Sequence, residues 1–161
     1  MNKKLISAPN IKITSISIGK ESIAVLMAFK PNKARWYHIN GYVTFVLHTK
    51  EHGDIQFTIF GDFYFDGRSG PWCVDWFEPN LGPLNKRLAW LVHDLLGYAT
   101  YFDFKTTNEV LRQLLIIAGD SKIKASMVRY FVSISDSWFG VPVEGDKFYP
   151  NIGKFEIKRI A

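Results

Sequence analysis

The spacing of apolar residues changes along this chain, and the change limits what the chain can fold into. Over the first 66 residues, apolar side chains alternate with polar ones or form short β-branched and aromatic blocks such as Tyr42–Leu47 and Ile55–Phe60. A period of two is typical of strands. After residue 83 the period moves toward 3.6, which is typical of helices. We therefore predict an α+β fold with an N-terminal antiparallel β-sheet, three helices packed on it and a C-terminal strand.

The β-rich part, residues 1–66, contains further predicted strands. Isoleucines alternate with Ser and Thr over 11–18, and the apolar block Ile23–Phe29 follows Gly19. The polar turn His48–Asp54 separates the two blocks named above and contains Gly53, so the three segments predict a β-hairpin. The aromatic triplet Phe63–Phe65 predicts a short strand that stops before Asp66.

Three helices are predicted between residues 84 and 140. The first runs from Leu84 or Asn85 to about Ala99, with apolar residues on two faces. The second has Thr106 and Glu109 at the spacing of a capping box, and Gly119 ends it. The third starts at Ser121 and ends before Gly140. Five of its apolar residues share one helix face, which predicts that this face packs into the core: Ile123, Met127, Tyr130, Ile134 and Trp138.

The segment between strands and helices, residues 67–83, is rich in glycine and proline, so it predicts a long loop. It also contains Trp72, Trp76 and Phe77, which indicates that the loop is packed. We predict a single domain over 1–161, with a β-rich part (1–66), this aromatic loop (67–83), a helical part (84–140) and a tail (141–161). The tail has two turn signals and then a predicted strand over 155–160.

The charge and the cysteine content bear on two possible properties of the protein, nucleic-acid binding and disulfide formation. The net charge of +5 and the pI near 9.3 permit weak binding to nucleic acid, but the basic residues are scattered, which favours a role in solubility. The single cysteine, Cys73, cannot form an internal disulfide.

The first ten residues lack the apolar stretch of a signal peptide. The longest apolar run, about 88–102, is shorter than a membrane helix and carries Asp94, so no membrane insertion is expected.

The pair His93-Asp94 within that run is the strongest candidate for a functional site. Burying an Asp and a His is costly unless each is paired, hydrogen-bonded or bound to metal. Adjacent residues on a helix point about 100° apart, so we expect each of the two side chains to need its own partner. In one interpretation His93 donates to Asp66 or to a backbone carbonyl and fastens the loop to the helix.

The alternative is a catalytic or metal site built from Asp66, His93 and Asp94. Three such groups could hold a divalent metal such as zinc or manganese, with an open position for water. His48 and His52 bracket the hairpin turn and are expected to be exposed turn histidines, and nothing marks Cys73 as an activated nucleophile. No cofactor is predicted outside the metal alternative.

Several short motifs occur in an order that resembles a known family. They are Phe65-Asp66-Gly67-Arg68-Ser69 followed by Pro71, then Leu91–Leu96 with the His-Asp pair, and then a helix near a Thr-rich cap. Together they resemble the phage and prophage family called domain of unknown function 1353, over roughly Gly61 to Gly119. The resemblance implies that Asp66, Ser69, Pro71, His93 and Asp94 form the polar signature of that family.

The chain departs from the family pattern at two positions. The family has a Tyr after its His-Asp-x-Leu motif, whereas this chain has Gly97 there and Tyr98 one residue later. A later Asp of the family aligns with Leu111, so only Asn108 or Glu109 could take the place of that Asp. These losses favour a structural role for the His-Asp pair over a catalytic one.

The resemblance implies a phage-encoded protein located in the host cytoplasm or in the virion. We predict a non-enzymatic virion component or host-interaction factor that binds other phage or host proteins, with Asp66, His93 and Asp94 as a structural polar cluster. Its predicted interface is Arg68, Ser69, Trp72, Trp76 and Phe77, because aromatic and arginine side chains often anchor interfaces. A metal-dependent hydrolase and a basic nucleic-acid-binding protein remain the alternatives.

Overall fold

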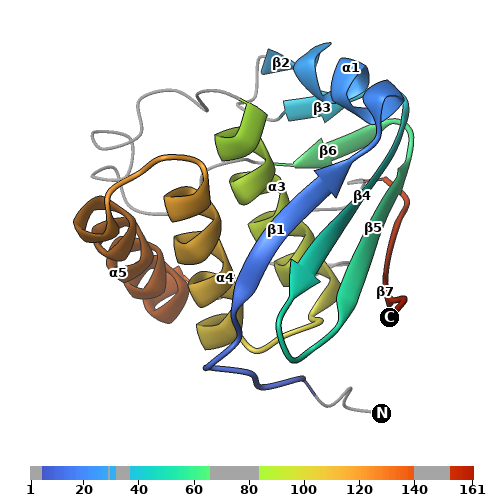
Figure 1. Ribbon diagram of the computed structural model, residues 1–161. Coiled ribbons are helices and arrows are strands. Elements are labelled where there is room, and N and C mark those ends of the chain that lie inside the picture. Colours follow the sequence, from blue (N-terminus) through green and yellow to red (C-terminus); the bar gives the residue numbers. More distant parts are fainter. Residues whose placement is uncertain (1–4, 29, 32–36, 66–83, 140–152) are drawn as a thin grey trace. The chain divides into compact units, whose positions relative to one another are not determined.

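The computed structural model of the chain describes residues 5–28, 30–31, 37–65, 84–139 and 153–161 (Figure 1). Strands dominate the described part up to residue 65, three helices follow, and a last strand ends the chain, so the α+β prediction is confirmed. The chain forms two compact units. We call them the sheet unit (Lys12–Asp66 and Pro150–Ala161) and the helical unit (Met1–Ile11 and Gly67–Tyr149).

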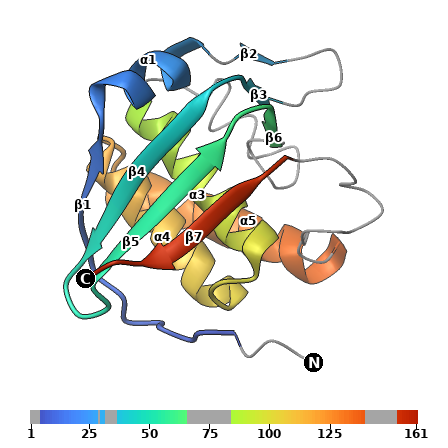
Figure 2. The ribbon, with the colours of Figure 1, turned by 90° about the vertical axis from the view of Figure 1, so that its right-hand side faces the viewer.

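The sheet unit contains a four-stranded antiparallel sheet (Figure 2). Its strands are β1 (Ile13–Ile18), β4 (Tyr42–Thr49), β5 (Asp54–Phe60) and β7 (Phe155–Arg159), in the order β1-β4-β5-β7. Alternate residues of the two central strands are buried, which is the period of two seen in the sequence: Val43, Phe45, Leu47, Ile55, Phe57 and Ile59. The predicted antiparallel sheet and the predicted C-terminal strand are both confirmed.

The β4–β5 hairpin has the predicted turn. Its register runs from the pair Tyr42 and Phe60 to the pair His48 and Asp54. Gly53 adopts φ +74° in the turn, and a Cβ there would lie 1.8 Å from the backbone oxygen of Ala161. Glycine is needed because an L side chain rarely adopts this conformation and would also clash.

The same unit contains a second, three-stranded sheet. Its strands are β2 (Lys30–Pro31), β3 (Tyr37–Ile39) and β6 (Phe63–Phe65), in the order β2-β3-β6. The predicted strand Phe63–Phe65 is therefore present, and it pairs with β3.

One predicted strand, Ile23–Phe29, is wrong, because residues Lys20–Ala28 form the helix α1. The amide of Ile23 donates to the carbonyl of Gly19 and closes the first turn. Only Ser22 and Leu26 of this helix are buried, and their spacing of four places them on one helix face. The apolar block was mistaken for a strand, but its Ala, Leu and Met residues are good helix formers.

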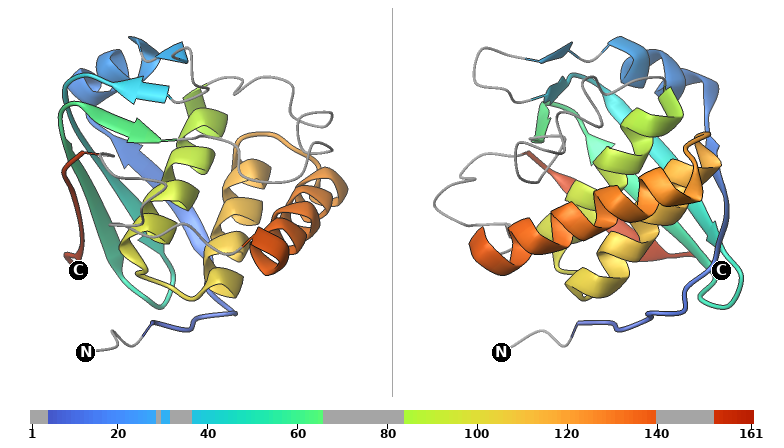
Figure 3. Two further views of the ribbon diagram at one scale, coloured as in Figure 1. Left: turned by 180° about the vertical axis from the view of Figure 1, so that it is seen from behind. Right: turned by 90° about the vertical axis from the view of Figure 1, so that its left-hand side faces the viewer.

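The helical unit contains α3 (Leu84–Ala99), α4 (Phe104–Ile117) and α5 (Lys122–Phe139), seen from two sides in Figure 3. The predicted bounds of the first helix are confirmed. Helix α3 packs against α4, and α4 packs against α5. An unbroken run from Leu88 to Leu96 is buried, which agrees with the prediction that α3 carries apolar residues on two faces.

The start of α4 differs from the predicted capping box. Asp103 is the N-cap, and its carboxylate accepts from the amide of Thr106 at 2.9 Å. Burial alone would raise the pKa of Asp103, but hydrogen bonds from Thr106 and Ser7 lower it overall. Thr106 lies inside the helix, where its hydroxyl accepts from the amide of Ala8 at 3.0 Å. Gly119, at φ +111°, directly follows the C-cap of this helix as predicted.

Helix α5 begins at Lys122, one residue after the predicted start at Ser121. The Ser121 hydroxyl accepts from the amide of Lys124 at 3.1 Å. Its buried face, however, is Ala125, Val128 and Val132. Three members of the predicted core stripe are exposed instead, Ile123 at 77%, Met127 at 38% and Tyr130 at 62%. The side chain of Trp138 lies outside the described part of the chain.

Three predictions are not tested here. The single domain and the packing of the helices on the sheet stay predictions, and the aromatic loop 67–83 lies outside the described residues. Within the described ranges, no helix is long and apolar enough to cross a membrane.

Candidate functional site

His93 is buried on α3 and forms a hydrogen bond with the next helix. It is 7% exposed, and its Nε2 lies 2.8 Å from Oδ1 of Asn108 on α4. An amide oxygen can only accept a hydrogen bond, so Nε2 of His93 carries the proton and donates it. The Trp90 ring packs edge-on against the imidazole, with ring centroids 6.2 Å apart.

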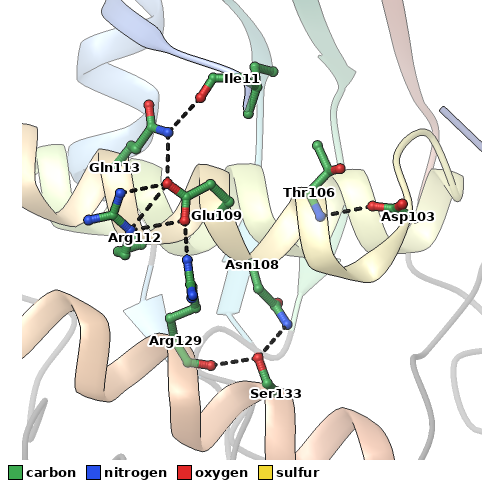
Figure 4. A network of polar contacts seen from close by, with 9 residues as sticks. All are labelled: Ile11, Asp103, Thr106, Asn108, Glu109, Arg112, Gln113, Arg129 and Ser133. Atoms are coloured by element: carbon green, nitrogen blue, oxygen red, sulfur yellow. Dashed lines mark hydrogen bonds and ion pairs between the residues drawn. The ribbon is translucent and has the colours of Figure 1, made fainter. Parts of the chain in front are cut away.

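The hydrogen-bond chain continues from α4 to α5 (Figure 4). Nδ2 of Asn108 donates to the Ser133 hydroxyl at 3.2 Å, and that hydroxyl donates to the carbonyl of Arg129 at 2.8 Å. Each group therefore donates to the next, from α3 through α4 to α5. We call His93, Asn108 and Ser133 the histidine chain.

Asp94 lies beside the imidazole rather than away from it. It is 4% exposed, and its Oδ1 is 3.5 Å from Nδ1 of His93. The expectation that the two side chains point to separate partners is therefore only partly right. The Cα–Cβ bonds of adjacent helix residues point about 100° apart, but the terminal atoms of the His93 and Asp94 side chains can still approach each other.

The other predicted site residues lie outside the described part of the chain. Asp66, the predicted partner of His93, is among them, as are Pro71 and the whole predicted interface: Arg68, Ser69, Trp72, Trp76 and Phe77. Among the described residues, no group of three or more His, Cys, Asp or Glu side chains could hold a metal ion. The predicted loop-to-helix contact and the predicted metal site are therefore not tested.

Glu109 forms a second polar cluster, one residue after Asn108 (Figure 4). Arg112 binds its carboxylate with two nitrogens, at 2.6 Å and 2.9 Å. Gln113 donates to the same carboxylate at 2.9 Å, and Arg129 of α5 donates from the facing helix. Gln113 also donates to the carbonyl of Ile11 at 2.7 Å, which ties the N-terminal segment to α4.

These donors determine the ionisation of Glu109. Burial alone would raise its pKa, but hydrogen bonds from Arg112, Gln113 and Arg129 outweigh burial and hold the pKa at about 2. The carboxylate therefore stays ionised at any physiological pH. A group with a pKa so far below neutrality is a poor proton donor or acceptor near pH 7.

An open pocket of about 400 Å³ lies beside these two clusters. Phe104 and Lys105 of α4 and Arg129 of α5 contribute to its wall, together with Pro9, Asn108, Glu109 and Ser133. Phe104 is 44% exposed and Lys105 is exposed. The pocket thus combines an accessible aromatic ring with basic side chains.

Sequence reasoning located the buried His93-Asp94 pair but missed its partner on α4. Asn108 was considered only as a substitute for the later Asp of the resembling family, which was aligned with Leu111. The spacing of Glu109 to Arg112 and to Gln113, three and four residues on a helix, was a usable signal for the second cluster. Nothing in the sequence indicated that Arg129 and Ser133 would join from another helix.

The chain matches no protein-family model, no curated protein and no solved structure. The resemblance to the phage family therefore stays a prediction based on short motifs.

Proposed function

We propose that the helical unit binds another protein through the exposed apolar stripe of α5, and that the histidine chain and the Glu109 cluster are structural. The stripe, which we call the outer face of α5, consists of Ile123, Met127 and Tyr130. This proposal keeps the predicted class, a non-enzymatic phage protein acting as a virion component or host-interaction factor. It locates the binding surface on α5 in addition to the predicted aromatic loop.

The observation that carries the proposal is the exposure of this stripe. The residues are spaced by four and three, so they lie on one side of the helix, and the buried Ala125, Val128 and Val132 lie on the other. Single exposed apolar residues are common on proteins and need no explanation. A contiguous stripe of large ones is typical of an interaction site.

The charges around the stripe indicate the chemistry of the partner. From Lys122 to Ile134, α5 contains three basic residues and no acidic one. Arg129 pairs with Glu109 and Lys124 lies 3.7 Å from Asp120, while Lys122 is exposed. The exposed Lys105 of α4 adds a further positive charge near Arg129 at the pocket. A second copy of the same face would be repelled by these charges. The surface fits a helical segment of another protein that carries Asp or Glu beside apolar residues at spacings of three and four.

The structural role of the polar clusters is supported by their geometry. His93 and Asn108 are both buried, and their hydrogen bonds run between helices instead of toward the surface. Buried hydrogen bonds between side chains of different helices favour one arrangement of those helices. The alternatives, a metal-dependent hydrolase using Asp66, His93 and Asp94 and a nucleic-acid-binding protein, stay predictions.

Selection from a displayed library of helical peptides tests the proposal without a known partner. The full chain is the bait, and the variants Met127→Glu and Tyr130→Glu are used for counter-selection after circular dichroism has shown that they fold. We expect enriched peptides with apolar residues at spacings of three and four and with adjacent Asp or Glu. Enrichment of no peptide, or of peptides that bind the charged variants equally well, would contradict the proposal.

A further inference from the structure

A serine, a histidine and an aspartate form a row of close polar contacts on the four-stranded sheet. Oγ of Ser17 on β1 lies 2.7 Å from Nε2 of His48 on β4. Nδ1 of the same ring lies 2.9 Å from Oδ1 of Asp54 on β5. All three residues belong to the sheet unit, so this row is independent of the clusters in the helical unit.

The register of the sheet creates the row. His48 and Asp54 are directly opposite each other across β4 and β5. Ser17 is opposite Val46, two residues before His48, so the imidazole reaches it diagonally across β1 and β4. Side chains on one sheet face at direct and diagonal positions are close enough to interact. His48 was expected to be an exposed turn histidine, but it lies within β4.

The proton positions follow from the chemistry of the three groups. An ionised carboxylate is only an acceptor, so the oxygen of Asp54 at 2.9 Å favours the tautomer of His48 that carries its proton on Nδ1. In the neutral ring, Nε2 then has a lone pair and accepts the hydroxyl proton of Ser17. This is the arrangement in which a histidine acts as general base toward a serine and an aspartate fixes its tautomer.

The serine is also accessible. Ser17 is exposed, while the side chains of His48 and Asp54 are 30% and 33% exposed. An electrophile can therefore reach Oγ from solvent without the sheet opening. Because the row lies on an open strand surface, it suits small esters with a good leaving group.

We propose that Ser17 is a nucleophile toward activated acyl esters, with His48 as general base and Asp54 as the positioning residue. Oγ of Ser17 attacks the carbonyl carbon while Nε2 of His48 takes the hydroxyl proton. The bond from that carbon to the leaving oxygen breaks, and His48 returns the proton to the departing alcohol. Water then attacks the Ser17 ester by the same route, which releases the acid and restores the hydroxyl.

The test is covalent labelling of the full chain with an alkyl fluorophosphonate. In that reaction Oγ attacks phosphorus and fluoride leaves, so one probe adds per reactive serine. We expect intact-mass spectrometry to show a single adduct, and peptide mapping to place it on Ser17. Ser17→Ala should abolish the adduct, and His48→Gln and Asp54→Asn should each slow labelling at least tenfold.

Ser126→Ala is the control, because Ser126 is an exposed serine of α5, outside the sheet unit. It should label at the rate of the unchanged chain. Thermal unfolding of each variant checks the fold, and Asp54→Asn, which keeps the side-chain shape, remains informative if His48→Gln unfolds. The proposal is overturned if Ser17 reacts no faster than it does in the urea-unfolded chain, or if Asp54→Asn labels at the unchanged rate.

Discussion

Glu109 joins two helices of the helical unit. Its oxygens accept from Arg112 and Gln113 of its own helix and from Arg129 of α5. Asn108, the preceding residue, links α3 and α5. Two consecutive residues of α4 thus hold both neighbouring helices, and the chemistry of each predicts a measurable effect on stability.

Glu109→Gln should remove an acid-sensitive part of the stability. The pKa of Glu109 is about 2 in the folded chain, below the ordinary value of 4.5. A lowered pKa contributes stability above the ordinary value, and this contribution is lost as pH falls from about 4.5 to 2. We expect the variant to be about 2–3 kcal/mol less stable at pH 7, with the difference disappearing toward pH 2.

Urea unfolding between pH 2 and pH 7 measures this effect. Glu156→Gln removes the same charge at an exposed position of β7 and is the control. A constant stability difference between Glu109→Gln and the unchanged chain over this range would show that the ion pairs do not stabilise the fold.

Asn108→Ala should destabilise the helical unit by ~1–3 kcal/mol, because it removes the acceptor of His93 and the donor to Ser133. The comparison is Ser126→Ala, which removes an exposed polar side chain from α5. Urea unfolding at pH 7 gives both values. Equal stability of the two variants would contradict a structural role for the histidine chain.

At the scale of the element, α5 shows how a helix can be predicted correctly while the wrong one of its faces is predicted to be buried. The period of 3.6 predicts the helix, and Ser121 predicts its start. Two apolar stripes follow that period, however, and the larger residues favoured Ile123, Met127 and Tyr130 as the core. The helix packs through its smaller stripe, which includes Ala125 and Val128, because small side chains let two helices approach closely.

Two substitutions on α5 compare the contributions of its buried and exposed faces to stability. Val128→Glu places a charge on the buried face and should destabilise the chain by several kcal/mol, since a buried unpaired charge is costly. Met127→Glu, one residue earlier, should leave stability within about 0.5 kcal/mol. Thermal unfolding distinguishes them, and similar large losses for both would mean that Met127 is part of the core.

At the scale of the whole molecule, neither unit is built from one continuous stretch of chain. Residues 1–11 belong to the helical unit, where Ile6 exchanges backbone hydrogen bonds with Tyr101 and Asp103. The last strand, β7, returns to pair with β5 of the sheet unit. Local periodicity could predict β7 as a strand, but it could not identify the partner of that strand.

The same limit applies to the candidate sites. The buried His93-Asp94 pair could be predicted because it interrupts a long apolar run. Its partner Asn108 and the row of Ser17, His48 and Asp54 depend on which segments become neighbours. Neither spacing nor composition contains that information.

Gly53→Ala tests how the turn between β4 and β5 packs against Ala161. The residue adopts φ +74°, and its new Cβ would meet the backbone oxygen of Ala161. We expect a loss of ~1–2 kcal/mol from the left-handed conformation, measured by urea unfolding. Gly19→Ser is the control, because a Cβ at Gly19 meets nothing within 4 Å and serine suits a helix start. A neutral Gly53→Ala would contradict this account of the turn.

The central claim, that the helical unit binds a protein through the outer face of α5, is tested most directly by titration calorimetry with a selected acidic helical peptide. We predict that Met127→Glu weakens binding at least tenfold, through a lost apolar contact and charge repulsion, while Ser126→Ala binds like the unchanged chain. Equal affinity of the peptide for Met127→Glu and for the unchanged chain would contradict the claim.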